Sequence, residues 1–234
     1  MDPKLTKWLR WLKIIHDEIQ RLVLAKDAFW EVQQIIKSNK KIQKPSYFYQ
    51  YLGNTYVSYS VIGMRRQFKV DSQSISLSRL LTELAETPEV ISRTYYKGLY
   101  SGSGVERFAD RDFDKFSEPG APHISKKKVL EDLKKLRDAG RKLEDYADRR
   151  VAHRDKREVK SPPLFKDGDA FIELVDKRYV KYHLLFHATS MLSLMPTYQY
   201  DWKEIVREPW IPPEPKESNE TLDAETRNEA TRAG

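Results

Sequence analysis

The sequence predicts an all-α protein built from long helices, on three observations. Several stretches carry an apolar residue at every third or fourth position, the period of a helix with one buried face. Only 9 glycines occur in 234 residues, too few for the many tight turns of an all-β fold. Hydrophobic residues make up 39% of the chain, which is enough to bury a sizeable core.

The first two helices are expected at residues 5–38 and 46–68. The first carries a continuous apolar stripe that no proline interrupts. The second is rich in aromatic residues, which would also suit a strand. Tyr47 and Tyr51 are nevertheless spaced for one face of a helix, and no strand-like alternation persists. We therefore predict two long helices here.

A third helix is expected at 76–84, where serines precede an apolar face and can cap its start. Pro88 ends it, and a short helical piece is expected at 90–99. We expect residues 101–124 to form a loop, because they contain the helix-breaking runs Ser-Gly-Ser-Gly and Pro-Gly-Ala-Pro.

Two further long helices complete the predicted domain. One begins at Ser125 and ends near His153, and the other spans about 169–195. We expect residues 1–212 to form a single helical domain. The acidic tail 213–234 has almost no large apolar residue to offset chain entropy, so we expect it to be disordered.

Charge and composition narrow the class of protein and its partners. The net charge is +7, and the chain contains no cysteine, which fits a reducing compartment. No apolar run approaches the roughly 18 residues of a membrane-spanning helix. We therefore expect a cytoplasmic protein without a membrane partner. The 125–160 segment holds an excess of six basic residues, which indicates an anionic partner such as nucleic acid or simply a solvated helix surface.

The helix end at 148–155 is the most informative stretch for chemistry. Arg149 and His153 are one turn apart and can face one ligand, and Arg150 and Arg154 form a second such pair. Arginine could hold the non-bridging oxygens of a phosphate diester while the imidazole moves a proton. The structural alternative is that these residues cap the helix and that Asp145 forms an ordinary ion pair with Arg149.

Two stretches carry a resemblance to a known superfamily. The helix end DYADRRVAHRDKR, residues 145–157, resembles the signature region of the HEPN superfamily, whose small helical proteins often act as metal-independent ribonucleases. The stretch RRQFKVDSQSISLSRLLTEL, residues 65–84, resembles the AbiU-type branch, which is linked to abortive infection against phage. The resemblance implies a HEPN-like helical bundle and a toxin or ribonuclease in antiphage defence. It also implies RNA as substrate, a homodimer and an antitoxin partner.

The resemblance also implies roles for individual residues. His153 would be the general acid and base, Arg149 would hold phosphate, and Asp148 would orient these groups. The candidates for RNA or phosphate binding are Arg150, Arg154, Arg65 and Arg66. No metal or other cofactor is expected, because the substrate's own 2′-hydroxyl would serve as nucleophile.

One departure from the superfamily pattern leaves a second hypothesis open. The pattern is an arginine, four to six residues, then a histidine, whereas Arg149 is separated from His153 by only three residues. The alternative is a non-catalytic helical module that binds RNA, a nucleotide or a partner protein through the 148–155 helix end. Elsewhere, His183 and His187 have a spacing that could chelate a metal, but no third ligand is evident, so no metal site is predicted.

Overall fold

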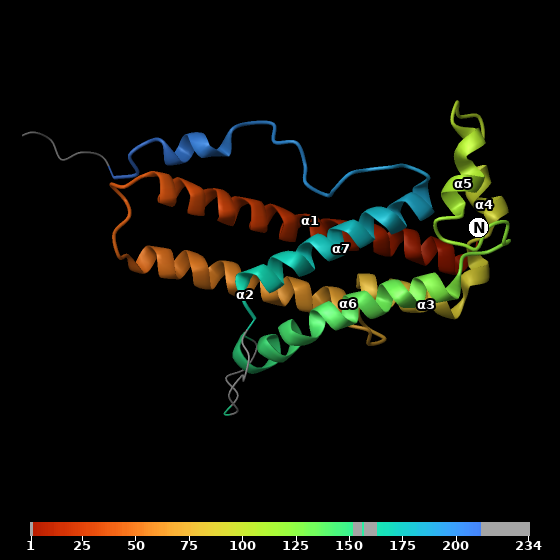
Figure 1. Ribbon diagram of the computed structural model, residues 1–234, viewed down its shortest axis with the longest axis horizontal. Coiled ribbons are helices and arrows are strands. Elements are labelled where there is room, and N and C mark those ends of the chain that lie inside the picture. The colour runs from red at the N-terminus through yellow and green to blue at the C-terminus, as the bar shows by residue number, and fades with distance from the viewer. Residues whose placement is uncertain (1, 152–155, 157–162, 212–234) are drawn as a thin grey trace, which may run out of the picture. The chain divides into compact units, whose positions relative to one another are not determined.

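The computed structural model describes residues 2–151, 156 and 163–211. The chain divides into two units, 1–196 and 197–234. Helices are the only regular secondary structure in the described residues, so the all-α prediction is confirmed (Figure 1). None of the helices within these described ranges is long and apolar enough to cross a membrane.

The two long N-terminal helices are confirmed. Helix α1 spans Pro3–Ser38 and helix α2 spans Tyr47–Phe68. The Asp2 side chain caps α1, and the Ser46 hydroxyl accepts a hydrogen bond from the Phe48 backbone N–H at the start of α2. Such caps satisfy backbone donors that the first turn of a helix leaves without a partner.

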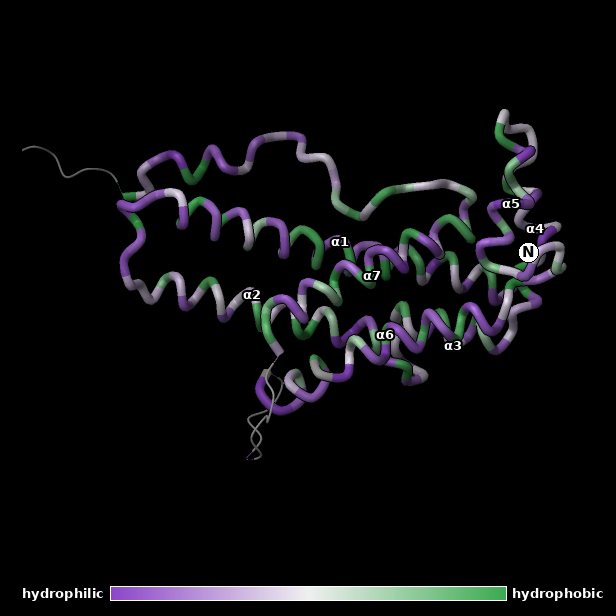
Figure 2. Tube along the Cα trace, in the orientation of Figure 1, coloured by the Kyte–Doolittle hydropathy of each residue, from purple (hydrophilic) through white to green (hydrophobic). Residues whose placement is uncertain are grey.

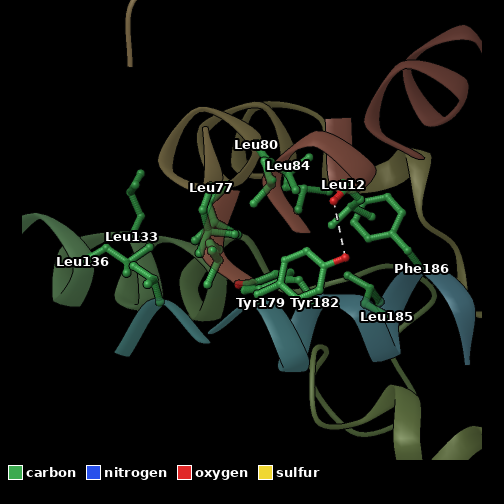
Figure 3. Close-up of a cluster of buried hydrophobic side chains, with 14 of the residues drawn as sticks. Leu12, Leu77, Leu80, Leu84, Leu133, Leu136, Tyr179, Tyr182, Leu185 and Phe186 are labelled. Carbon is green, nitrogen blue, oxygen red and sulfur yellow. Dashed lines mark hydrogen bonds between the residues drawn. The ribbon is translucent and has the colours of Figure 1, made fainter. Parts of the chain in front are cut away.

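The core of the first unit forms between α1, α2 and three later helices, α3 (Leu77–Glu86), α6 (Lys126–Tyr146) and α7 (Phe165–His187). Helix α1 packs against α2, α7 and α3, and α6 packs against α3, α2 and α7. Figure 3 shows leucines of α1, α3 and α6 facing the aromatic side chains of α7. The Tyr179 hydroxyl there donates a hydrogen bond to the Leu12 carbonyl at 3.3 Å. Hydrophilic and hydrophobic residues alternate along each long helix, as expected when one face is buried (Figure 2).

Two buried carboxylates tie the helices together. Glu83 of α3 accepts a hydrogen bond from the Trp8 indole at 2.7 Å and pairs with Lys7 at 2.5 Å. Asp132 of α6 has an exposed side-chain fraction of only 6% and pairs with Lys181 of α7 at 2.6 Å. A carboxylate buried to this degree needs such partners to replace its hydration.

The segment between α3 and α6 contains the short helix expected at 90–99 but differs from its prediction at 101–124. The expected loop at 101–124 contains short helices, and Phe113 and Phe116 within it are buried. Arg93 organises this region, because its guanidinium pairs with Asp110 at 3.1 Å and Asp114 at 2.5 Å. The short elements are η1 (Pro88–Val90), α4 (Arg93–Gly98), η2 (Glu106–Phe108) and α5 (Ala109–Phe113).

Helix α7 begins and ends earlier than the predicted 169–195. It stops at His187 because Ala188 adopts a left-handed backbone with φ of 50°. The Asp176 carboxylate then accepts hydrogen bonds from the Ser193 hydroxyl at 2.7 Å and the Leu194 N–H at 2.8 Å. These contacts hold the chain after the helix back along α7.

The second unit contains the short helix η4 (Trp202–Val206), which the Asp201 side chain caps. The predicted disordered tail at 213–234 lies outside the described residues.

Candidate phosphate-binding site

The helix that carries the predicted site changes type near its end. Helix α6 gives way at Ala147 to the π-helix η3, which spans Ala147–Val151. The helix predicted from Ser125 to near His153 is present as far as Val151, but its last five described residues form a π-helix. In a π-helix each backbone hydrogen bond spans five residues, so the regular side-chain stripe of an α-helix does not continue through this turn. Such turns occur frequently at functional sites.

The described charged residues around this turn differ in their surroundings. The Arg149 Nε atom lies 2.6 Å from the Asp145 Oδ1 atom, so the ion pair considered from the sequence is present. The Asp148 carboxylate lies 2.7 Å from the Arg65 guanidinium of α2. Arg150 is exposed.

Arg65 and Arg66 point to different neighbours at the end of α2. Arg65 is partly buried and reaches η3 through Asp148. The Arg66 guanidinium has an exposed fraction of 64% and lies 3.7 Å from Glu18 of α1, while Gln67 donates a hydrogen bond to the same carboxylate at 2.6 Å. Of the two arginines, only Arg65 has a partner in η3, so the predicted pair does not form one joint site.

The backbone of α6 approaches a side chain of α2 closely at Gly140. Gly140 of α6 faces the Phe68 ring so tightly that an added Cβ would lie 2.7 Å from the ring. The Ser76 hydroxyl then caps α3 by accepting a hydrogen bond from the Arg79 N–H at 2.9 Å. The stretches 65–84 and 145–157 are distant in sequence, and this packing brings their described parts together.

The predicted catalytic histidine, His153, and the predicted phosphate ligand Arg154 lie outside the described residues. The described part of the candidate site therefore consists of two guanidiniums held by carboxylates, from Arg65 and Arg149, and the exposed side chain of Arg150. Held guanidiniums of this kind can receive the oxygens of a phosphate with little loss of side-chain freedom.

Three of the other histidines, His16, His183 and His187, form a separate cluster. The ring centroids of His183 and His187 lie 4.6 Å apart on α7, and the Tyr179 ring contacts both His183 and His16 of α1. Burial lowers the pKa of both α7 histidines below its usual value. Within the described part of the chain, no group of three His, Asp or Glu side chains could hold a metal ion.

Sequence reasoning named Arg65 as a candidate but missed its ion pair with Asp148, and it missed Glu18. Asp148 and Arg65 lie on helices that are distant in the sequence, and Glu18 belongs to the polar face of α1. The only signal for this contact in the sequence was the order of the stretches 65–84 and 145–157, the two that carry the resemblance.

Comparison with known proteins adds no relative: no family model, curated protein or solved structure matches the chain. The case for a function therefore depends on the chemistry of the residues described above.

Proposed function

We propose that the protein is a HEPN/AbiU-like protein that acts on RNA through the 148–155 helix end. The observation that carries the proposal is the ion pair between Arg65 and Asp148. It joins the arginine-rich end of one family-like stretch to the helix end of the other. Positively charged groups gathered beside a π-helical turn suit the phosphodiester backbone of RNA.

In the proposed reaction no metal takes part. The substrate's 2′-oxygen attacks the neighbouring phosphorus, the bond to the 5′-oxygen breaks, and a 2′,3′-cyclic phosphate forms. His153 would take the proton from the 2′-hydroxyl or give one to the departing 5′-oxygen. Arg149 and Arg150 would hold the non-bridging oxygens. Asp145 would position Arg149, with which it forms an ion pair, and Asp148 would position Arg65 in the same way.

A second function, RNA binding without cleavage, is favoured by a specific observation. Arg149 and His153 are separated by only three residues in the sequence, fewer than the four to six of the superfamily pattern. The same helix end would then bind RNA, a nucleotide or a partner protein through its arginines alone.

RNA cleavage in the presence of EDTA distinguishes the two functions. The purified chain is incubated with total RNA, with His153→Ala and Arg149→Ala as test variants. Arg137→Ala is the matched control, because Arg137 is an exposed arginine on α6 away from the π-helix. Cleavage by wild type and Arg137→Ala that is lost in His153→Ala supports the nuclease. Intact RNA with all four proteins rejects it.

RNA binding tests the part that both functions share. Affinity for a single-stranded RNA is measured over a series of salt concentrations. We expect Arg150→Ala to weaken binding and to reduce the salt slope by about one, because one phosphate contact is lost. Arg137→Ala should change neither quantity. Equal effects of the two substitutions, or salt-independent binding, would reject the helix end as an RNA site.

The proposal extends to assembly and to the cell. A homodimer would place two helix ends face to face and complete the site, and light scattering of the purified chain measures this directly.

A cytoplasmic toxin of this kind would slow growth on expression and would require an antitoxin partner. His153→Ala should relieve the growth defect, and continued toxicity of that variant would contradict the proposed role.

A further inference from the structure

The net positive charge of the chain resides in one stretch, residues 32–70, which contains no acidic residue. The stretch covers the end of α1, the connection to α2 and the whole of α2. The remaining 35 basic residues of the chain are matched by its 35 acidic ones, so this acid-free stretch carries a charge equal to the full net charge of +7. Its basic residues are Lys37, Lys40, Lys41, Lys44, Arg65, Arg66 and Lys69. Such a concentration of charge favours an anionic partner.

The structure places these positive charges at the two ends of α2. The four lysines lie around the connection between α1 and α2, and all are exposed. This connection is held in place, because the Tyr49 hydroxyl donates a hydrogen bond to the Ile42 carbonyl at 2.6 Å. At the other end of α2, the Arg66 guanidinium is exposed and Arg65 contacts the π-helix η3 through Asp148.

Tyrosine rings lie between these two groups of charges, on one exposed face of α2. The exposed fractions of Tyr47, Tyr51 and Tyr59 are 87%, 63% and 47%. Their spacing of four and eight residues places them on the same side of the helix. The first half of α2 extends beyond the end of α6 (Figure 1). The residues exposed between Tyr51 and Tyr59 are small and polar: Asn54, Thr55 and Ser58.

We propose that single-stranded RNA binds along this face of α2, between the lysines at its start and the candidate phosphate-binding site at η3. The proposal rests on the proposed action on RNA and narrows the substrate to an unpaired strand. Unpaired bases stack on exposed aromatic rings, while basic side chains bind the phosphates on either side. In a duplex the base faces are covered by stacking, so the tyrosine rings would have no equivalent contact. The face from Tyr47 to Arg66 is about 30 Å long, at 1.5 Å per residue.

The polar residues on the face favour RNA over an anionic membrane. Lysines and aromatic rings also attract acidic lipids, and a helix that lies in a membrane surface buries a continuous apolar face. On α2 the exposed stripe is interrupted by polar side chains between Tyr51 and Tyr59. Stacking on bases requires only the separate rings, because each ring contacts one base.

Replacement of the rings tests the stacking directly. Binding of the full chain to an oligouridylate, and to its duplex with oligoadenylate, is measured by fluorescence anisotropy. We expect the single strand to bind more tightly. The double variant Tyr47→Leu and Tyr51→Leu should weaken it about 5- to 100-fold, the effect of removing an aromatic ring from a base. The matched control, Tyr47→Phe and Tyr51→Phe, keeps the rings and should bind as wild type does. Circular dichroism checks that both variants fold.

Replacement of the lysines tests the path of the strand. Lys40→Gln, Lys41→Gln and Lys44→Gln are combined in one variant, and its RNA affinity is measured over a series of salt concentrations. We expect the salt slope to fall by about two, because three phosphate contacts are lost. The matched control replaces three exposed lysines of α6 with glutamine and should keep the slope of wild type: Lys126, Lys127 and Lys135.

Arg150→Ala separates this proposal from the proposed function. If Arg150→Ala weakens binding and the leucine variant does not, RNA binds at η3 without the α2 face, and this proposal alone is overturned. If the leucine variant weakens binding and Arg150→Ala does not, the α2 face is supported and the helix end is rejected. Absence of RNA binding by wild type overturns both.

Two further results would overturn the α2 face as a single-strand site. One is tighter binding to the duplex than to the oligouridylate. The other is binding to vesicles of phosphatidylcholine and phosphatidylserine that the leucine variant retains, while the two tyrosine variants bind RNA equally well. That result would assign the face to a membrane surface, because leucine replaces tyrosine in an apolar contact but not in stacking on a base.

Discussion

The Arg65 guanidinium and the Asp148 carboxylate lie 2.7 Å apart, one at the end of α2 and the other in the π-helix η3. The exposed fractions of the two side chains are 29% and 46%, so water screens the pair only in part. The contact connects two segments that are distant in the sequence. The ion pair therefore helps to hold the helix end in place, in addition to adding its two charges there.

A double-mutant cycle should detect this connection. We expect Arg65→Ala and Asp148→Ala to be coupled by about 0.5–1 kcal/mol in the free energy of unfolding, the range for a partly exposed pair. Urea unfolding of the two single variants and the double variant measures the coupling. A value near zero would mean that the two charges contribute independently.

The close approach of α2 and α6 predicts an unfavourable substitution at Gly140. In Gly140→Ala the new Cβ would lie 2.7 Å from the Phe68 ring, which itself packs against Phe171 with centroids 5.7 Å apart. We expect a loss of about 1–3 kcal/mol from overpacking, despite the higher helix propensity of alanine.

Gly53→Ala on α2 is the matched control for this prediction. An added Cβ at Gly53 meets nothing within 4 Å. We expect this substitution to stabilise the protein by about 0.5–1 kcal/mol, because it only raises helix propensity. Thermal unfolding of both variants measures the contrast, and the same sign for both would contradict the close packing.

The buried carboxylate of Asp132 predicts a large effect on stability. It pairs with Lys181 at 2.6 Å and Arg178 at 3.2 Å, and it accepts a hydrogen bond from Tyr182 at 3.1 Å. Asp132→Ala would leave both cations without this partner, so we expect a loss of about 3 kcal/mol in urea unfolding. Asp138→Ala removes an exposed carboxylate from the same helix and should cost less than about 0.5 kcal/mol. Similar losses in both variants would show that burial is not the cause.

Stability should fall in mildly acidic solution because of His183 and His187. Burial lowers the pKa of each imidazole in the folded protein. The unfolded chain therefore binds the proton more tightly, and protonation favours unfolding. The contribution of these two histidines to the free energy of unfolding is retained above about pH 6.5, the usual pKa of histidine. It is lost as the pH falls through the lowered pKa.

Melting temperatures between pH 8 and pH 5 measure this effect, with the double variant His183→Gln and His187→Gln for comparison. The double variant should lose less stability than wild type across that interval. The neighbouring His16 and Lys13 also contribute positive charge to the pair and remain in the variant. An unchanged slope would assign the acid sensitivity to other groups.

Local patterns predicted much of the fold because helix starts depend on residues within one turn. Ser46, Ser76 and Ser125 each cap the helix that follows them, as their hydroxyls accept from backbone N–H groups two or three residues later. The apolar stripes of α1 and α3 likewise mark the faces that are buried.

The candidate site was less predictable, because its geometry depends on contacts between distant residues. The prediction that side chains of residues 145–153 share one helix face assumed α-helical spacing, which the π-helix at 147–151 interrupts. Arg65 and Arg66 are neighbours in sequence, yet one pairs with η3 and the other lies toward α1. The roles assigned to His153 and Arg154 remain predictions.

The amino-acid sequence by itself determined the helical class, the helices α1, α2 and α3, and the serine caps of α3 and α6, because periodicity and capping are local. Only the tertiary structure decided that α7 stops at His187, that Arg65 pairs with Asp148, and that the face of α2 with Tyr47 and Tyr51 is exposed. Those features arise from packing between helices far apart in the chain, where a backbone turn, a close approach at Gly140 or a distant carboxylate sets the geometry.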